Sequence, residues 1–484
     1  MIAELPSHGA LAPIPFPSCQ ANRFVPGVIL IVAVKILLLG TYELGRQPFG
    51  LASPTAWLRK RGQSVSSFDL SRQSLDEATL READLIVFYL PMHTATRIAL
   101  EWLPAIRTQN STAHFCACGL YASLNGAQLR TAGFSTILGA EFESDLVRLA
   151  EELSSGTDLS PAEPAPSRQP KLQFEVPDRS GLPALSKYAH VVLPDGTHRI
   201  AGYTEASRGC KHLCRHCPVV PVYLGQFRIV PQEVVLADIR KQVAAGAQHI
   251  TFGDPDFFNG PTHAARIVQA LHAEFPALTY DVTIKIEHLL NQRSRLDTLA
   301  RTGCLFITSA VESLENGVLS KLEKGHTRAE FLLALQHCRT AGLTLQPTFI
   351  PFTPWTTRAS YFDLLEAIAD HELISSVPAI QLAIRLLIPS RSRLLELPEI
   401  ASIVGEFDSE KLVYPWRHAD RALDELAEEI SAIVAGAEKR KESRTETFAH
   451  IWDAATKLQQ SPRTALRLTS SSPPAPYLSE PWYC

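Results

Sequence analysis

The sequence predicts an α/β protein made of two successive strand–helix segments and a small helical region after them. Short apolar runs alternate with amphipathic stretches from Lys35 to about Leu153, and again from Tyr203 to Ile388. A stretch rich in Ser and Pro, residues 154–172, lies between the two segments. Strands that alternate with helices form parallel sheets, so we expect a doubly wound sheet first and a partial or complete β/α barrel second.

Composition narrows the class of protein. The chain has 484 residues, of which 45% are hydrophobic, and that is enough for two or three domains with apolar cores. Its net charge of −4 gives no basic field, so a nucleic-acid partner is not favoured. Nine irregularly spaced cysteines do not suit a disulfide framework, and this favours a cytoplasmic protein.

The longest apolar run, Val28–Leu39, is interrupted by Lys35 and is shorter than the ~20 residues that cross a bilayer. We therefore expect no membrane association and read the end of this run as the first buried strand. Residues 1–34 are interpreted as a leader, or as upstream of a translation start nearer Val34.

The first domain, residues 35–153, is expected to contain five strands and at least three helices. The strands are predicted at Lys35–Gly40, Ser64–Asp69, Asp84–Leu90, Ala113–Cys118 and Thr136–Gly139. The helices are predicted at Ser53–Arg61, after Thr94 and from Glu143. Residues 154–172 read as a linker.

The second domain, residues 173–390, is expected to be the barrel. Its strands are predicted at Tyr203–Ser207, His249–Gly253, Tyr280–Lys285, Leu305–Val311, Thr344–Pro351 and Ile380–Ile388. Its helices are predicted at Pro231–Ala245, Thr262–Phe275, Leu289–Thr302, Arg328–Ala341 and Ser360–His371. Helices at Asp420–Lys441 and Glu446–Gln459 then form a C-terminal region, residues 391–460, and residues 461–484 read as a flexible tail.

Three cysteines, Cys210, Cys214 and Cys217, follow the first strand of the predicted barrel. Loops at the carboxyl ends of barrel strands carry the chemistry of such folds, and closely spaced thiolates are the usual ligands of iron–sulfur clusters. A zinc site completed by His212 or His216 is an alternative, as are three unrelated core cysteines.

The pattern Cys-x-x-x-Cys-x-x-Cys after Ser207-Arg208-Gly209 resembles the signature of the radical S-adenosylmethionine (SAM) superfamily. The stretch Ser207–Phe258 is similar to members that carry a Rossmann-like, cobalamin-binding-like N-terminal domain. The resemblance implies a [4Fe–4S] cluster on the three cysteines, with SAM on the open iron. It also implies reductive cleavage of SAM to a 5′-deoxyadenosyl radical, with electrons from an external flavodoxin- or ferredoxin-like donor.

The same resemblance suggests residues for SAM binding. His216 stands where the family often places an aromatic residue against the adenine, and Gly253 and Asp254 stand where the amino group of SAM is received. Glu312 resembles the ligand of the ribose hydroxyls, and Phe349 is expected to flank the adenine. On the sixth predicted strand, Gln381 and Arg385 are interpreted as facing the substrate.

Cobalamin is allowed by the resemblance but not favoured by the residues. The loop after the first strand, residues 41–50, has no histidine that could ligate cobalt, and His93 after the third strand suits a local hydrogen bond better. We expect Cys116 and Cys118 to face opposite sides of their strand as buried core thiols.

The chain ends at Cys484 after an aromatic pair. It resembles most closely the radical SAM proteins named for a Cys-Sec-Ala-Glu-Pro or Cys-Cys-Ala-Glu-Pro tail. This suggests a redox-active Cys484, in a selenoprotein whose UGA codon was read as a stop.

The leading interpretation is therefore a radical SAM enzyme whose unidentified substrate is a small molecule or peptide rather than tRNA. The alternative is a non-catalytic iron–sulfur protein for electron transfer or sensing.

Overall fold

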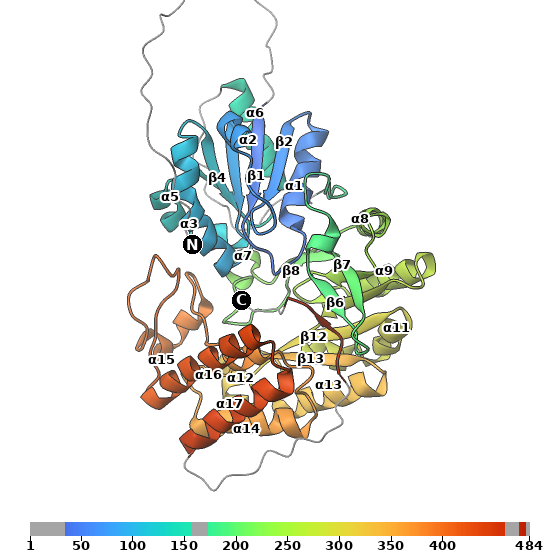
Figure 1. Ribbon diagram of the computed structural model, residues 1–484, viewed down its shortest axis with the longest axis vertical. Coiled ribbons are helices and arrows are strands. Elements are labelled where there is room, and N and C mark those ends of the chain that lie inside the picture. The colour runs from blue at the N-terminus through green and yellow to red at the C-terminus, as the bar shows by residue number, and fades with distance from the viewer. Residues whose placement is uncertain (1–33, 157–172, 460–473, 481–484) are drawn as a thin grey trace, which may run out of the picture. The chain divides into compact units, whose positions relative to one another are not determined.

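The first sheet consists of five parallel strands in the order β2-β1-β3-β4-β5 (Figure 1). A computed structural model describes residues 34–156, 173–459 and 474–480 of the chain. The strands are β1 (Lys35–Gly40), β2 (Ser64–Asp69), β3 (Leu85–Tyr89), β4 (His114–Cys118) and β5 (Thr136–Ile137). The helices of this domain are α1 (Phe49–Lys60), α2 (Glu77–Glu82), α3 (His93–Gln109), α4 (Leu120–Leu124), α5 (Gly126–Ala132) and α6 (Glu143–Ser155).

Burial explains the strand order of the first sheet. After Lys35, every residue of β1 is buried, as a central strand requires, whereas β2 alternates between buried and less buried side chains, as an edge strand does. Ile36 pairs with Val65 on one side and with Leu85 on the other. The predicted doubly wound domain is confirmed.

One expectation about this sheet was wrong. Cys116 and Cys118 belong to the same core cluster, while Phe115 and Ala117 pack in the cluster on the other face. Side chains two positions apart on a strand share a face, so the two thiols face the same side. Both are buried, as expected of core thiols.

The second sheet has seven strands in the order β13-β12-β11-β10-β7-β6-β14, and its first five are parallel. These five are β7 (His198–Thr204), β10 (His249–Phe252), β11 (Thr279–Thr283), β12 (Cys304–Glu312) and β13 (Thr344–Phe349). The antiparallel edge consists of β6 (His190–Val192) and β14 (Tyr477–Leu478). A separate two-stranded ribbon joins β8 (Ser207–Gly209) to β9 (Phe227–Ile229).

Helices follow the parallel strands and bury their apolar faces against them. They are α8 (Gln232–Ala244), α9 (Pro261–Glu274), α10 (Ile286–Asn291), α11 (Leu296–Arg301), α12 (Asn316–Lys321), α13 (Arg328–Thr340) and α14 (Arg358–Asp370). The short helix α7 (Val220–Tyr223) lies between β8 and β9 of the ribbon. Short 3-10 turns are η1 (Leu185–Lys187), η2 (Phe257–Asn259), η3 (Arg293–Arg295) and η4 (Ala379–Leu382). The sheet is a curled partial barrel, and the predicted β/α segment is confirmed.

The predicted sixth barrel strand, Ile380–Ile388, is not a strand. Its first half is the turn η4, and its second half forms one isolated bridge between Phe352 and Arg385. The Arg385 guanidinium lies over the Trp416 ring and pairs with Asp424 at 2.5 Å, so the segment is held by the C-terminal region. The apolar side chains that led to the strand prediction therefore pack against the C-terminal region instead.

The C-terminal region comprises η5 (Arg393–Glu396), α15 (Pro398–Ala401), α16 (Arg421–Arg440) and α17 (Arg444–Gln459). The two predicted helices are present, and they join the same hydrophobic core as the barrel. For example, Trp452 of α17 contacts Phe362 of α14 with ring centroids 4.8 Å apart.

Part of the predicted flexible tail is ordered. Tyr477 and Leu478 form β14 against β6, and the Tyr477 ring lies under Arg444 of α17. A strand pairing and a cation–π contact offset the entropy that a Ser- and Pro-rich segment loses on ordering. Cys484, residues 1–33 of the segment 1–34 interpreted as a leader or as upstream of the translation start, and most of the predicted linker lie outside the described residues.

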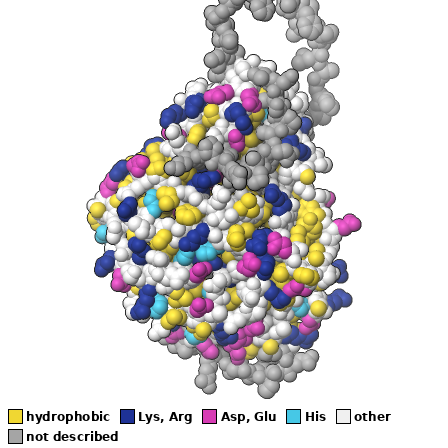
Figure 2. Space-filling model, turned by 180° about the vertical axis from the view of Figure 1, so that it is seen from behind, with side chains coloured by type: hydrophobic (Ala, Val, Ile, Leu, Met, Phe, Trp, Pro, Cys, Tyr) yellow, Lys and Arg dark blue, Asp and Glu magenta, His cyan; other side chains and the backbone are white. Residues whose placement is uncertain are grey.

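Among the described residues, no helix combines the length and the apolar character that crossing a membrane requires. On the face shown in Figure 2, Lys and Arg side chains are interspersed with Asp and Glu.

Candidate functional site

The three cysteines lie on a segment that the ribbon β8–β9 closes at its base. We call this segment, residues 210–226, the cysteine loop. Gly209 enters it with φ of 75°, and a Cβ there would lie 2.4 Å from the Tyr223 ring and 2.6 Å from the Gln226 carbonyl oxygen. Only glycine combines that conformation with so close an approach, which explains the Ser-Arg-Gly sequence before Cys210.

Buried ion pairs hold the ribbon to the N-terminal domain. Residues 33–484 form one compact unit, and within it Arg208 and Arg228 are direct cross-strand partners. Arg208 pairs with Glu143 at 2.7 Å and with Glu205 at 2.8 Å, and Arg228 pairs with Glu141 at 3.0 Å. Two like charges opposite each other would repel, so the glutamates are what allow this pairing. The N-terminal domain thereby braces the base of the cysteine loop.

The three thiols lie close enough to one another and to Lys324 for their charges to interact, with Cys214 buried and Cys210 and Cys217 half-buried. Burial, and then the charges of Cys214 and Cys210, raise the pKa of Cys217 to about 12. Burial also raises the pKa of Cys210. Lys324 is buried, which would lower its pKa, but Glu312 and then Cys214 raise it above the ordinary value. Without a metal, Cys210 and Cys217 thus stay protonated, and Lys324 is placed to offset the negative charge of a bound cluster.

The zinc alternative does not suit this arrangement. Four-coordinate zinc with Zn–S bonds of ~2.3 Å needs sulfurs only about 3.8 Å apart. In the described part of the chain, the group of ligand atoms within 4.8 Å of one another is His212, Asp256 and His288, without the cysteines. Of the two histidines proposed as a fourth ligand, His216 contacts Glu312 through Nε2.

Two of the predicted SAM residues meet beside the thiols. Glu312 ends β12 with φ of 70°, at the point where the register of β12 against β13 shifts. Its Oε1 accepts hydrogen bonds from His216 Nε2 at 3.1 Å and from Lys324 Nζ at 3.2 Å. Although burial opposes it, Lys324 and His216 lower the pKa of Glu312 to about 2. The carboxylate is therefore ionised and held rigidly next to the cysteine loop.

Asp254 has a positional role in addition to its predicted one. Its Oδ2 accepts from the Ala206 amide at 2.9 Å and its Oδ1 from the Ser207 hydroxyl at 2.5 Å. Burial raises its pKa to about 7. The neighbouring Gly253 is packed against Tyr203, whose hydroxyl would lie 1.8 Å from an added Cβ. Asp254 fixes the start of β8, and its contact with the amino group of SAM stays a prediction.

The ring of Phe349 contacts Phe331 of α13 edge-on, with centroids 6.4 Å apart, on the helix-covered face of β13. Its expected contact with the adenine stays a prediction. Along a strand the side chains alternate, and this position belongs to the outer core.

The two residues predicted to face the substrate point to different surroundings. Gln381 is buried and accepts from the Phe349 amide at 3.2 Å, so it holds the end of β13. Arg385 is engaged by Asp424, and by Trp416, whose carbonyl accepts from Nη2 at 2.8 Å. Because this segment does not form a sixth strand, Gln381 and Arg385 do not lie on one face of a strand.

Sequence reasoning missed Lys324 and His326, which follow α12. Both ring nitrogens of His326 are buried without a hydrogen-bond partner, and burial together with Lys324 and Lys285 lowers the pKa of His326 to about 4. In the sequence, the run Lys324-Gly325-His326 was the signal that could have identified these two residues. The structure explains the glycine between them, since Gly325 has a φ of 71°.

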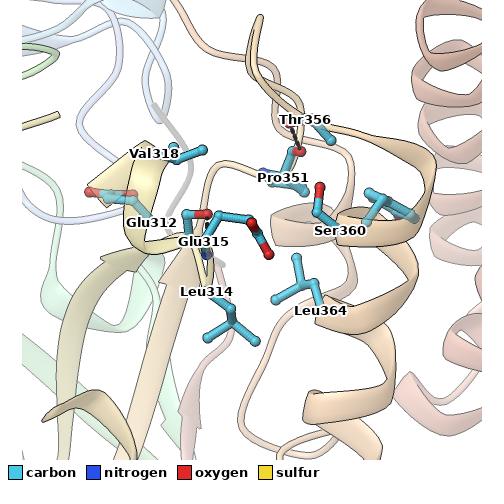
Figure 3. A pocket seen from close by; sticks show the side chains of 10 residues that line it. Glu312, Leu314, Glu315, Val318, Pro351, Thr356, Ser360 and Leu364 are labelled. Carbon is cyan, nitrogen blue, oxygen red and sulfur yellow. Dashed lines mark hydrogen bonds between the residues drawn. The ribbon is translucent and has the colours of Figure 1, made fainter. Parts of the chain in front are cut away.

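A small pocket, partly open to solvent, adjoins Glu312 (Figure 3). It lies where β12 and β13 end, against the first turns of α14. Polar lining comes from Glu312, Glu315 and Ser360, and apolar lining from Leu314 and Leu364.

The N-terminal domain offers no imidazole to a corrinoid. Its described histidines are His93 and His114. His93 Nε2 lies 2.6 Å from the Lys411 carbonyl oxygen, and His114 begins β4, at the opposite end of the strand from the ligand-binding edge. A histidine-ligated cobalamin therefore does not fit these residues.

The fold and the site together consist of a doubly wound domain, followed by a partial barrel of parallel strands whose first loop presents three thiols. Residues 204–365 match the family described as the radical SAM superfamily, so this part of the chain is a radical SAM domain. The family implies a [4Fe–4S] cluster and SAM.

Solved structures share both domains. The cobalamin-dependent S-adenosylmethionine radical enzyme OxsB with aqua-cobalamin bound has a TM-score of 0.66 at 16% identity, over 82% of this chain and 66% of that chain. The radical S-adenosylmethionine methyltransferase TsrM from Kitasatospora setae, with tryptophan and a SAM analogue bound, has a TM-score of 0.60 at 18% identity, over 76% of each chain. At such identities the likeness concerns the fold.

A curated relative is the tRNA-2-methylthio-N(6)-dimethylallyladenosine synthase of Pelodictyon phaeoclathratiforme. It is 27% identical over 161 residues, which are 31% of this chain and 36% of that protein. The chain thus matches about a third of the length of this relative.

Proposed function

We propose that this protein is a radical SAM enzyme that acts on a small molecule or peptide through a 5′-deoxyadenosyl radical. The observation that carries the proposal is the convergence of the cysteine loop, Glu312, His216 and Lys324 at the carboxyl ends of the barrel strands. When bound, the cluster supplies the electron that cleaves SAM, and an external flavodoxin- or ferredoxin-like donor renews it. Such a cluster needs a reducing compartment, so we place the protein in the cytoplasm.

The residues of the chain have distinct parts in this proposal. Cys210, Cys214 and Cys217 hold the cluster, and Lys324 offsets its negative charge. Glu312 is ionised and fixed, as a residue that accepts hydrogen bonds from ribose hydroxyls should be. His216 keeps Nδ1 buried without a hydrogen-bond partner and turns Nε2 to Glu312, so its ring orientation is set before SAM binds.

The choice of substrate class depends on charge and space. The net charge is −4, and both signs are interspersed on the visible face in Figure 2, so an extended polyanion such as tRNA finds no basic track there. The pocket beside Glu312 carries a second carboxylate, Glu315, and suits a small polar or cationic group. The relative that modifies tRNA matches this chain over about a third of its own length.

The test is anaerobic reconstitution with iron and sulfide, reduction with dithionite and an assay for 5′-deoxyadenosine. We expect the wild-type protein to form it, Cys214→Ala to lose both cluster and product, and Cys338→Ala to keep both. Cys338 is a matched control because it is a buried thiol outside the cysteine loop. A complete cluster without deoxyadenosine would favour the electron-transfer or sensing alternative, and tightly bound zinc on the three cysteines would exclude the proposal.

A further inference from the structure

Three potential metal ligands converge next to the cysteine loop without belonging to the cysteine set. His212 lies in the loop, Asp256 follows β10 and His288 is in α10. Asp256 Oδ2 lies 2.6 Å from His288 Nδ1 and 3.4 Å from His212 Nε2. The two imidazole rings have centroids 4.7 Å apart at a tilt of 56°. Three separate segments thus direct one ligand atom each to a common point.

These three atoms are buried and lack a proper hydrogen bond. His212 Nε2, Asp256 Oδ2 and His288 Nδ1 are each inaccessible to solvent, and their contacts with one another are close ion pairs rather than well-formed hydrogen bonds. Buried polar atoms without partners are costly, so their convergence calls for a group that satisfies all three.

A divalent metal ion satisfies them. Two imidazoles and one carboxylate form a common ligand set for Zn²⁺ and for non-haem Fe²⁺. With bonds of ~2.0–2.2 Å, neighbouring ligand atoms lie about 2.9–3.5 Å apart. The 3.4 Å between His212 Nε2 and Asp256 Oδ2 already falls in that range. The 2.6 Å between His288 Nδ1 and Asp256 Oδ2 would have to lengthen by a few tenths of an ångström.

The surroundings provide the second shell that a ligating histidine needs. Binding through Nε2 places the proton of His212 on Nδ1, and Glu287 Oε2 lies 3.7 Å from that atom. Lys285 Nζ lies 3.1 Å from Nδ1 and 3.3 Å from Glu287. Metal binding would turn His212 Nδ1 from accepting the bond of Lys285 to donating toward Glu287.

We propose that His212, Asp256 and His288 bind one divalent transition-metal ion, separate from the cluster on the three cysteines. The ion ties the segment between Cys210 and Cys214 to the ends of β10 and α10. It therefore acts as a clamp that holds the cysteine loop in its folded position. This inference does not depend on SAM cleavage.

The test uses Co²⁺ alone as the probe, on the full chain with Cys210, Cys214 and Cys217 all changed to Ala. We expect one Co²⁺ per chain, visible d–d absorption without sulfur-to-cobalt charge transfer, and a raised thermal midpoint. Asp256→Asn and His288→Gln should each lower the affinity at least 100-fold. His198→Ala is the matched control, because His190 and His198 form a stacked imidazole pair elsewhere that could collect cobalt.

A second measurement covers the case in which the triple variant misfolds. Wild-type protein with its cluster reconstituted is incubated with Zn²⁺, desalted and analysed for metals. We expect one zinc in addition to the cluster iron, and His288→Gln to lose the zinc and keep the iron. Folded protein that binds no stoichiometric metal, or binding that survives both Asp256→Asn and His288→Gln, would overturn the proposal.

Discussion

Glu312 Oε1 and His216 Nε2 lie 3.1 Å apart although 96 residues separate them in the chain. One ends a barrel strand and the other lies in the cysteine loop, between the second and third thiols. Their contact makes the cysteine loop and the predicted ribose ligand one rigid unit, with Lys324 as its buried counterion. Changes to this unit should therefore affect stability and SAM binding together, and the two effects can be separated.

Glu312→Gln should destabilise the protein and abolish SAM binding. The substitution leaves Lys324 charged, buried and unpaired, which costs about 3–5 kcal/mol. Adding Lys324→Met should restore most of the stability, measured by urea unfolding, but not the affinity for SAM, measured by calorimetry. A double variant that binds SAM as well as wild type would show that Glu312 only pairs with Lys324.

Acid should lower the free energy of unfolding through protonation of Glu312. The pKa of Glu312 in the folded chain is about 2, against an ordinary value of 4.5. Its contribution is therefore complete above pH 4.5 and is lost as the pH falls toward 2. The amount is on the order of 3 kcal/mol. Urea unfolding between pH 5.5 and 3 should show a steeper decline for wild type than for Glu312→Gln, and parallel declines would contradict this.

Arg208→Met should loosen the cysteine loop. The change leaves Glu143 buried without its cation, and breaking such a pair costs about 3–5 kcal/mol. Because Arg208 lies two residues before Cys210, the iron content after reconstitution should fall as well. Arg240→Met removes a solvent-exposed pair with Glu274 and should leave both the unfolding midpoint and the iron content unchanged. Equal iron content in Arg208→Met and Arg240→Met would mean that the brace is dispensable.

Removal of residues 474–484 should destabilise the barrel edge. The deletion removes strand β14 from its pairing with β6. It also removes the Pro476 carbonyl oxygen, which accepts a hydrogen bond from Gln346, and the Tyr477 ring, against which the Arg444 guanidinium lies. We expect a loss of about 1–2 kcal/mol in urea unfolding. Deleting residues 481–484 leaves β14 in place and should not move the midpoint. An unchanged midpoint in the longer deletion would show that the edge does not depend on β14.

Much of the architecture can be predicted from local patterns. The buried run of β1, the alternation in β2 and the helical stripes of the barrel reflect periods of 2 and 3.6 residues, and these are properties of short segments. The cysteine loop could also be located, because its spacing and its place after a strand are local features. The sequence by itself thus determined the two α/β domains and the three thiols.

Tertiary structure decided what depends on distant partners. Arg385 pairs with Asp424 and Trp416 instead of joining a sixth strand, Phe349 turns to Phe331, and Tyr477 finds β6 and Arg444. None of these contacts has a periodic signal, because each joins segments that come together only in the folded chain. The same holds for Lys324 beside the thiols. The energies of burial and ion pairing that settle such choices depend on three-dimensional neighbours, which no local pattern contains.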